Sequence, residues 1–474
     1  MPENENKVFR TVKRTVRSSD PGGPEKEFYG VNLITSSAKF SAESGRLMTP
    51  LEAEKRRSQL LTGAHSGVSS IRKMRKATRK LSLKPAPKIP TAPSDPRAIR
   101  RRFFLTQAKA HVERIDKQLL LALAALALIG LAAVFSATHS YQNASRYLII
   151  QSAVTVVGFA AVAVMSLFDY RAFAKKYRVI ILINAALLLF TYFFGTGVTG
   201  ETNANWIDLG IIKLQPSEFA KILFIYAFAV HLYVVRDRIN KVFTAATVFL
   251  HALLILGLTF LQKDLGTLTI FIFITAVMCF TGGLNLWYFL TAAVGAVAAS
   301  PLIWDKLGEF QRQRILVIFD PSIDPNAVDI RHQTARSLAA ISLGGLRGSG
   351  YLHGEVTQGN FFAKHTDMIY STICEEFGFF GGAALLALYA FFIVKIILIA
   401  RSCDNPLGCL ICTGVAAMFI IQIIENIGMC LGVMPVIGIT LPFISYGGSS
   451  ALSAYLGLGL VFSVCTHKDR SFFA

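Results

Sequence analysis

The chain has 474 residues, of which 53% are hydrophobic and 16% charged, and its formal net charge is +19. A soluble globular domain carries roughly 25% charged residues, so the composition excludes an ordinary string of soluble domains. The apolar residues also come in blocks of the ~20 residues that a helix needs to cross a bilayer. The composition therefore predicts an all-α polytopic membrane protein.

Ten apolar blocks predict about ten membrane-spanning helices. They lie near 118–138, 146–167, 177–197, 216–235, 241–262, 266–282, 285–304, 369–400, 408–431 and 441–465. Basic residues gather before residue 118, between 169 and 178, and between 236 and 241, whereas loop 139–146 has a single one, Arg146. The positive-inside rule then predicts that both termini are cytosolic.

Three parts of the chain follow from this pattern. Residues 118–466 form the predicted membrane domain, 467–474 a short cytosolic C-terminus, and 1–117 a basic, proline-containing, largely disordered cytosolic tail. The tail begins without the apolar stretch of a signal peptide. Its positive charge fits either contact with anionic lipid headgroups or docking to a cytosolic partner, and no nucleic-acid partner is expected.

The longest connection between spans, 305–368, lies on the predicted outer side between the seventh and eighth spans. Long loops of this kind are usually functional. Within it, Gln333–Leu343 has the pattern of an amphipathic helix that lies on a membrane or protein surface. We therefore expect part of a functional site in this loop.

Ionisable residues at membrane depth are costly, so each one is a candidate functional residue. Glu218 and Lys221 stand three residues apart at the start of the fourth span and share a helix face. They form either a structural ion pair or the charged lining of a cavity. Asp264, between the fifth and sixth spans, belongs either to a tight connection or to the same site.

Asp367 lies where the long outer loop enters the eighth span, so it is either a helix-start carboxylate or a catalytic or binding group. Glu375 follows eight residues later, about two helical turns on, and would share its face if one helix runs through both. Segment 438–450 places glycines and hydroxyl side chains inside an apolar run. This pattern fits either tight helix packing or a broken helix that lines a cavity.

Together these stretches resemble the shape, elongation, division and sporulation (SEDS) family, whose members include RodA, FtsW and SpoVE. The resemblance covers about residues 118–466. The segments that carry it are Asn205–Gly210, Gln215–Lys221, Phe310–Arg314, Asp320-Pro321, His332-Gln333, Asn360–Asp367, Glu375–Gly378 and Leu441–Ser450. Several specific blocks in one order are a far stronger signal than a single short motif.

The resemblance implies a bacterial peptidoglycan glycosyltransferase that polymerises lipid II at the outer face of the cytoplasmic membrane, in elongation or division. It further implies ten spans, cytosolic termini and a class B penicillin-binding transpeptidase as partner. The essential aspartate of the family corresponds to Asp367, and its Glu and Lys of the fourth span to Glu218 and Lys221. Asn205, Lys263, His332 and Arg336 depart from the usual family pattern.

Glycan polymerisation needs a base for the acceptor hydroxyl and positive charge for the departing pyrophosphate. We expect Asp367 to be this catalytic base in an inverting reaction. The candidate pyrophosphate contacts are Lys221, Arg312, Arg314, Arg331 and Arg336. The full set of expected substrate-binding residues is Glu218, Lys221, Arg312, Arg314, Gln333, Arg336, His365, Glu375, Ser445 and Ser449. A divalent cation, Mg²⁺ or Mn²⁺, fits the same charge requirement, but no ligand set is readable.

The alternative function is transport, by a lipid II flippase or another carrier of lipid-linked substrates. A carrier would use Glu218, Lys221 and Asp264 as sites near the bilayer midplane. A non-catalytic scaffold that recruits a transpeptidase is a third, weaker hypothesis. A long outer loop that ends in Asp367 favours the polymerase.

Overall fold

The computed structural model describes residues 10–16, 26–32, 111, 113–196, 205–208, 210, 213–325, 331–359 and 361–467. They belong to two compact units, Met1–Ile99 and Arg100–Ala474. In the first unit, β1 (Arg10–Val16) and β2 (Lys26–Asn32) pair as an antiparallel hairpin. The rest of the predicted tail up to residue 110, and the C-terminus after residue 467, lie outside the described residues.

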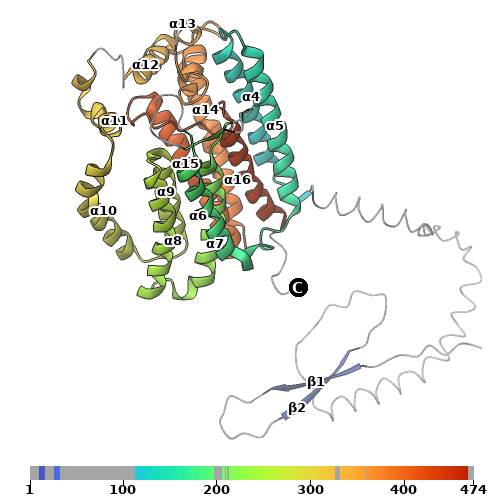
Figure 1. The fold of residues 1–474 in the computed structure, drawn as a ribbon. Coiled ribbons are helices and arrows are strands. Elements are labelled where there is room, and N and C mark those ends of the chain that lie inside the picture. The colour runs from blue at the N-terminus through green and yellow to red at the C-terminus, as the bar shows by residue number, and fades with distance from the viewer. Residues whose placement is uncertain are drawn as a thin grey trace, which may run out of the picture. The chain divides into compact units, whose positions relative to one another are not determined.

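The second unit is a bundle of long apolar helices (Figure 1). Its long helices are α4 (Lys117–Thr138), α5 (Ala144–Leu167), α6 (Tyr177–Phe194), α7 (Pro216–Val235), α8 (Val242–Leu261), α9 (Leu265–Thr281), α10 (Leu286–Lys306), α14 (Ile369–Arg401), α15 (Pro406–Cys430) and α16 (Gly448–His467). Among the described residues, nine of these segments are long and apolar enough to cross a membrane, and α9 is an apolar helix of 17 residues. Nine of the ten predicted spans are therefore confirmed, and the sixth is present as a shorter apolar helix.

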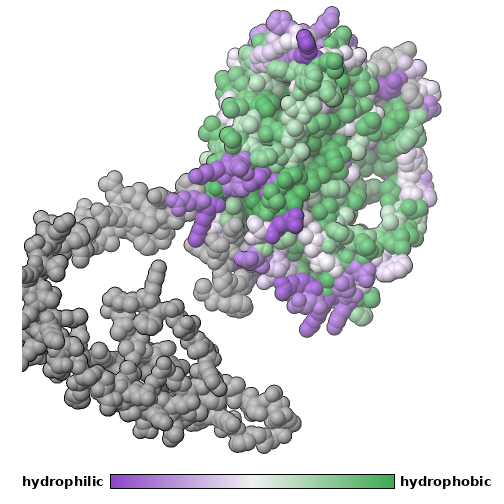
Figure 2. All heavy atoms as spheres, turned by 180° about the vertical axis from the view of Figure 1, so that it is seen from behind, coloured by the Kyte–Doolittle hydropathy of each residue, from purple (hydrophilic) through white to green (hydrophobic). Residues whose placement is uncertain are grey.

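The outer surface of the bundle is suited to lipid. Figure 2 shows apolar side chains over the middle of one face and hydrophilic side chains gathered towards its ends. Large apolar side chains such as Leu182, Leu250 and Val297 are two-thirds or more exposed. Such a surface is unfavourable in water and favourable in a bilayer, so the chain is a multi-pass membrane protein.

Shorter elements connect the long helices. They are η2 (Ala174–Lys176), β3 (Ile207–Asp208), β4 (Lys213–Leu214), η3 (Arg236–Arg238), α11 (Glu309–Phe319), η4 (Pro321–Ile323), α12 (His332–Gly344) and α13 (Glu355–Gln358). The helix α12 confirms the predicted amphipathic helix at Gln333–Leu343. By contrast, α11 was not expected, because its charged residues show no apolar periodicity.

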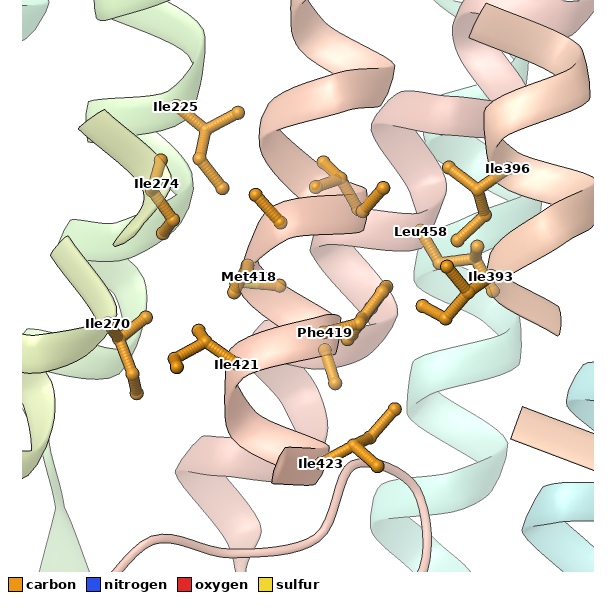
Figure 3. Packing of buried hydrophobic residues seen from close by; sticks show 14 of the residues in the cluster. Ile225, Ile270, Ile274, Ile393, Ile396, Met418, Phe419, Ile421, Ile423 and Leu458 are labelled. Atoms are coloured by element: carbon orange, nitrogen blue, oxygen red, sulfur yellow. The ribbon is translucent and has the colours of Figure 1, made fainter. Parts of the chain in front are cut away.

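The core of the bundle is built around α15, which packs against α14, α9 and α7. Figure 3 shows Ile421 of α15 pointing toward Ile270 of α9, and Phe419 lying on another side of the helix. Phe419 stacks edge to face with Phe392 of α14, with ring centroids 5.4 Å apart. At the opposite extreme, α10 stands at the edge of the bundle (Figure 1) and has no buried residue.

The last span begins later than its hydropathy predicts. We expected a helix from residue 441, but α16 starts at Gly448 and 441–447 is a loop. Phe443 has a left-handed backbone with φ +64°, and the Leu441 N–H donates to the Ser445 hydroxyl at 2.8 Å. Local side-chain hydrogen bonds of this kind compete with helix formation, so an apolar run here forms a loop instead.

A second break divides α14 at Gly378, whose φ is +65°. The backbone of segment 345–350 lies against this break and pairs with the helix backbone on both sides of Gly378. That segment donates hydrogen bonds to the carbonyls of 375–376 at 2.9 and 3.0 Å, and accepts from the N–H groups of 379–380 at 2.8 and 3.3 Å. The loop after α12 thus supplies the backbone hydrogen bonds that the kinked helix cannot make for itself.

The Gly378→Ala variant should be strongly destabilised. A Cβ at this position would lie 2.4 Å from the backbone N of Gly348, and an L-residue with positive φ costs ~1–2 kcal/mol even without a clash. Thermal unfolding in detergent should show a clear loss of stability. Gly257→Ala in α8 is the matched control, because a Cβ there meets no atom within 4 Å. Equal unfolding temperatures for the two variants would contradict the role assigned to the break.

Candidate functional site

A cavity of about 1070 Å³ lies where the predicted outer ends of the helices meet the long loop. Its wall is formed by the first turns of α5, α7, α9 and α16, by α11, and by loops before α14 and α16. Its ionisable lining residues are Arg146, Lys213, Lys263 and Arg314, and Glu218, Asp264, Glu309 and Asp367. Both signs of charge therefore face one space, which suits a polar ligand that carries negative charge.

The loop that carries Asp367 is fixed through its backbone. The carbonyl of His365 accepts a hydrogen bond from the Tyr446 N–H at 2.9 Å, and that of Thr366 from the Ser445 hydroxyl at 2.6 Å. The carbonyl of Asp367 accepts from Asn426 Nδ2 at 2.7 Å. Three consecutive carbonyls are thus tied to α15 and to the loop before α16.

The side chain of Asp367 faces the cavity beside Gly438. A Cβ at Gly438 would lie 3.8 Å from Asp367 Oδ2, and φ of this glycine is +75°. The N-cap of α14 is Met368, which makes no side-chain cap. Asp367 therefore lies in the loop one residue before the N-cap of α14, and its catalytic or binding role stays a prediction.

Glu375 does not share a face with Asp367, because α14 begins only at Ile369. The condition for a shared face, one helix running through both residues, is thus not met. The fully buried Glu375 carboxylate accepts hydrogen bonds from the N–H groups of Val356 and Thr357 at 2.7 and 2.8 Å and from the Thr357 hydroxyl. Glu375 therefore holds α13 and lies outside the cavity lining.

The residue before His365 is a buried lysine. Lys364 is fully buried, and its ammonium donates to the Ser140 hydroxyl at 3.0 Å and to the Gly359 carbonyl at 3.2 Å. It also lies 4.7 Å from the centre of the Tyr141 ring. Burial lowers the pKa of Lys364 to about 8. Lys364 thus ties the Asp367 loop to the connection between α4 and α5.

His365 lies inside an aromatic cage and not in the cavity wall. Its ring centre is 5.7 Å from that of Tyr141, 5.1 Å from Tyr147 and 5.6 Å from Tyr446. Burial lowers the pKa of His365 to about 4, so the ring is neutral at physiological pH. Tyr147 and Tyr446 themselves line the cavity, so His365 supports the wall from behind.

Glu218 and Lys221 form the predicted ion pair, with Lys221 Nζ 2.9 Å from Glu218 Oε1. Glu218 Oε2 accepts from the Ser453 hydroxyl at 2.7 Å. Glu218 lines the cavity, whereas Lys221 is fully buried behind it. Glu218 is thus both a member of a structural ion pair and part of the charged cavity lining, whereas Lys221 is not placed to contact a ligand directly.

Asp264 joins the same region as the N-cap of α9. It accepts hydrogen bonds from the backbone N and the hydroxyl of Thr267 at 3.0 and 2.8 Å, and it also lines the cavity. Burial raises the pKa of Asp264. Asp264 therefore belongs to the tight connection between α8 and α9 and also to the site.

Of the other expected binding residues, Arg314, Gln333 and Ser449 line the cavity. The Ser449 hydroxyl also accepts from the Gln215 N–H at 3.1 Å, which joins α16 to the start of α7. Arg312 instead donates to the Trp304 carbonyl at 2.9 Å. Ser445, Arg312 and the exposed Arg336 are not among the lining residues.

Three cations of the lining were not predicted as binding residues: Arg146, Lys213 and Lys263. Arg146 lies in the first turn of α5, Lys213 in β4 and Lys263 between α8 and α9. They are 50 or more residues apart in sequence, and only the tertiary fold brings them to one cavity. Lys213 stands two residues before the Gln215–Lys221 stretch, so its position could have marked it as a candidate binding residue. Asn426 was also missed, because a single Asn in an apolar helix shows no pattern of its own.

Within the residues that the structure describes, no group of three or more His, Cys, Asp or Glu side chains is arranged to hold a metal ion. Mg²⁺ often uses only one or two carboxylates and takes its other ligands from substrate phosphates and water. Participation of a divalent cation thus remains a prediction from charge, and no dedicated protein ligand set supports it.

Comparisons with known proteins point to one family. A sequence model described as "Cell cycle protein", of FtsW, RodA and SpoVE, matches residues 117–470. The peptidoglycan glycosyltransferase MrdB of Escherichia coli is 33% identical over 362 residues, which cover 75% of this chain and 94% of the relative. The probable peptidoglycan glycosyltransferase FtsW of Bacillus subtilis is 31% identical over 372 residues, with 75% and 92% covered.

Solved structures give the same result. A chain from a structure described as "Structural coordination of polymerization and crosslinking by a peptidoglycan synthase complex" matches with a TM-score of 0.64 and 29% identity, over 75% of this chain and 99% of that one. The crystal structure of Thermus thermophilus rod shape determining protein RodA matches with a TM-score of 0.57 and 27% identity, over 75% and 98% of the two chains.

The Asn426→Leu variant should loosen the Asp367 loop. It leaves the carbonyls of Asp367 and Ile439 without their 2.7 Å hydrogen bonds from Nδ2, and each unpaired buried group costs ~1–3 kcal/mol. Hydrogen exchange of 363–368 and 438–446 should become faster. Asn184→Leu in α6 also removes a buried amide, which donates to the Ala220 carbonyl, and should leave exchange of these loops unchanged.

The His365→Phe variant should change the pH dependence of stability. The pKa of His365 is about 4 in the folded chain, against 6.5 as the ordinary value, so the unfolded chain binds the extra proton first. Stability of the wild type therefore falls as the pH drops from 6.5 to 4, by up to ~3 kcal/mol from this residue. Phe keeps the aromatic packing and should flatten the decline in thermal unfolding. An unchanged pH profile would show that His365 titrates normally.

Proposed function

Because the chain belongs to the FtsW, RodA and SpoVE family of cell cycle proteins, we propose that it is a peptidoglycan glycosyltransferase that polymerises lipid II. The observation that carries this proposal is the fixed presentation of Asp367 at the wall of a cavity that four cations and three further carboxylates also line. The curated relatives are named for the same activity. In elongation or division, this reaction extends the glycan strands of the cell wall.

Asp367 is the catalytic base in this proposal. Its carboxylate takes the proton from the acceptor sugar hydroxyl, the hydroxyl oxygen attacks the anomeric carbon of the donor, and the bond from that carbon to the lipid pyrophosphate breaks. A single displacement inverts the anomeric configuration. General bases of this kind contribute ~10²–10⁴-fold to a rate, and the tied carbonyls of 365–367 supply the positioning that the step requires.

The leaving pyrophosphate needs positive charge close to it. Arg314 is the expected cation that lines the cavity, and Arg146, Lys213 and Lys263 line it as well. Arg146, Lys213 and Lys263 are exposed, and a lysine ammonium on its four-carbon stem can follow a phosphate as it departs. A divalent cation would add positive charge for the pyrophosphate, and the cavity carboxylates Glu218, Asp264, Glu309 and Asp367 are the groups that could hold it, although no dedicated set of three or more ligands is arranged in the described residues.

A transporter would place its charged residues near the bilayer midplane. Glu218 instead lies in the first turn of α7, and Asp264 is the N-cap of α9. Both are at helix ends beside the long loop. This position supports chemistry on a sugar headgroup whose lipid stays in the bilayer, and it favours a polymerase over a flippase.

The position of the protein in the cell follows from the same proposal. The membrane is the bacterial cytoplasmic membrane, both termini are cytosolic, and the cavity faces outward. The partner is a class B penicillin-binding transpeptidase, which crosslinks the strands that this chain makes. The similarity to a chain of a structure described by polymerization and crosslinking in a synthase complex supports such a partnership.

The Asp367→Asn variant tests the proposal. Purified protein, alone and with its transpeptidase, is supplied with labelled lipid II, and glycan polymer is measured. The variant should lose ~10²–10⁴-fold in rate, because Asn cannot take the hydroxyl proton. Glu355→Gln is the matched control, since Glu355 is an exposed carboxylate of the same outer loop that does not line the cavity.

Equal polymer from the wild type and Asp367→Asn would remove Asp367 as the base. Lipid II flipping in vesicles that survives Asp367→Asn but is lost in Glu218→Gln would point to transport instead.

A further inference from the structure

Glu425 of α15 is a buried carboxylate that the proposed reaction does not use. Figure 3 shows that Ile421 points from α15 toward Ile270 of α9. Residues four positions apart on a helix share a face, so Glu425 continues this face one turn further toward the outer end. The apolar seam between α15 and its neighbours therefore ends in a carboxylate.

Glu425 lacks the partners that a buried carboxylate needs. It is 2% exposed, and its Oε2 atom is buried without a hydrogen bond from any residue that the structure describes. Lys221 and Asp264 are close enough to interact with it electrostatically. A buried carboxyl oxygen without a donor is strongly unfavourable, so a hydrogen bond from a nearby charged donor would stabilise it.

Lys221 is such a donor. Its ammonium is fully buried and, in the described part of the chain, donates only the 2.9 Å hydrogen bond to Glu218 Oε1. An ammonium has three N–H donors. Glu218 depends less on this bond, because its other oxygen accepts from the Ser453 hydroxyl. Lys221 thus has N–H donors to spare. Its partner Glu218 has a second donor in the Ser453 hydroxyl, whereas Glu425 Oε2 has no donor among the described residues.

We propose that Glu425 is a second counter-ion of Lys221, and that the ammonium alternates between Glu218 in the cavity wall and Glu425 behind it. Glu425 is then a positioning residue. When Lys221 pairs with Glu425, the Glu218 carboxylate is free to accept a hydrogen bond from a hydroxyl or amide group of a saccharide in the cavity. When Lys221 pairs with Glu218, the Glu218 carboxylate is not available for such a contact. The saccharide part of the inference rests on the proposed function.

A stability cycle tests the pairing without any activity measurement. Thermal unfolding in detergent is compared for wild type, Glu218→Gln, Glu425→Gln and the double variant. Each single variant leaves Lys221 one of these two counter-ions, whereas the double variant leaves the buried ammonium without either and with only its electrostatic interaction with Asp264, which is strongly destabilising. The shift of the double variant should exceed the sum of the single shifts by at least ~3 °C. Additive shifts would overturn the proposal.

Two further variants keep the outcome interpretable if the double variant fails to fold. Adding Lys221→Met removes the ammonium and should recover stability relative to the double variant. No recovery would mean that lost packing causes the defect, and it would overturn the proposal. Glu309→Gln is the matched control for Glu425→Gln, because Glu309 also is a carboxylate near this site but lines the cavity from α11. Its shift should simply add to that of Glu218→Gln.

The saccharide contact is tested with lipid II. Glu425→Gln should keep Lys221 on Glu218 and raise KM about tenfold, the change expected for one hydrogen bond, with kcat nearly unchanged, and Glu425→Asp should restore KM. An unchanged KM would overturn the contact while leaving the stability cycle valid. No polymer from the wild type would refute the proposed function and not the paired counter-ions.

Discussion

The site depends on three consecutive carbonyl groups, those of His365, Thr366 and Asp367. Each accepts a hydrogen bond from a donor on α15 or on the loop before α16. Backbone groups away from water must be paired, so these bonds fix the path of the loop. A carboxylate on a free loop would sample many positions, whereas here only the side-chain torsions of Asp367 remain to be set.

The long outer loop is also held in its middle, at segment 345–350, by α14. The carbonyls of 375–376 accept hydrogen bonds from segment 345–350 where Gly378 breaks the helix. Glu375 caps the neighbouring turn of α13 through Val356 and Thr357. A broken helix would be costly in a membrane, and the loop offsets this cost. Helix and loop therefore stabilise each other.

Hydropathy was sufficient to predict the spans, because crossing a bilayer needs an apolar run of fixed length. It failed at 441–447, where the same apolar character forms a loop held by Ser445. Asp367, Glu218 and Asp264 could be singled out from sequence because charge is rare at membrane depth. Arg146 and Lys263 could not, because they lie far apart in sequence, in the first turn of α5 and between α8 and α9. Their convergence is a property of the tertiary fold alone.

The depth of the charged groups follows from desolvation. Glu218 and Asp264 lie at helix starts, where backbone N–H groups and the helix dipole favour a carboxylate. Lys221 and Glu425, one turn deeper, are almost completely buried. Groups at the helix ends can face an aqueous cavity and carry charge at modest cost, whereas each deeper group needs a partner of opposite sign. The outer position of the cavity is thus the place where this fold can hold reactive charge while its core stays apolar.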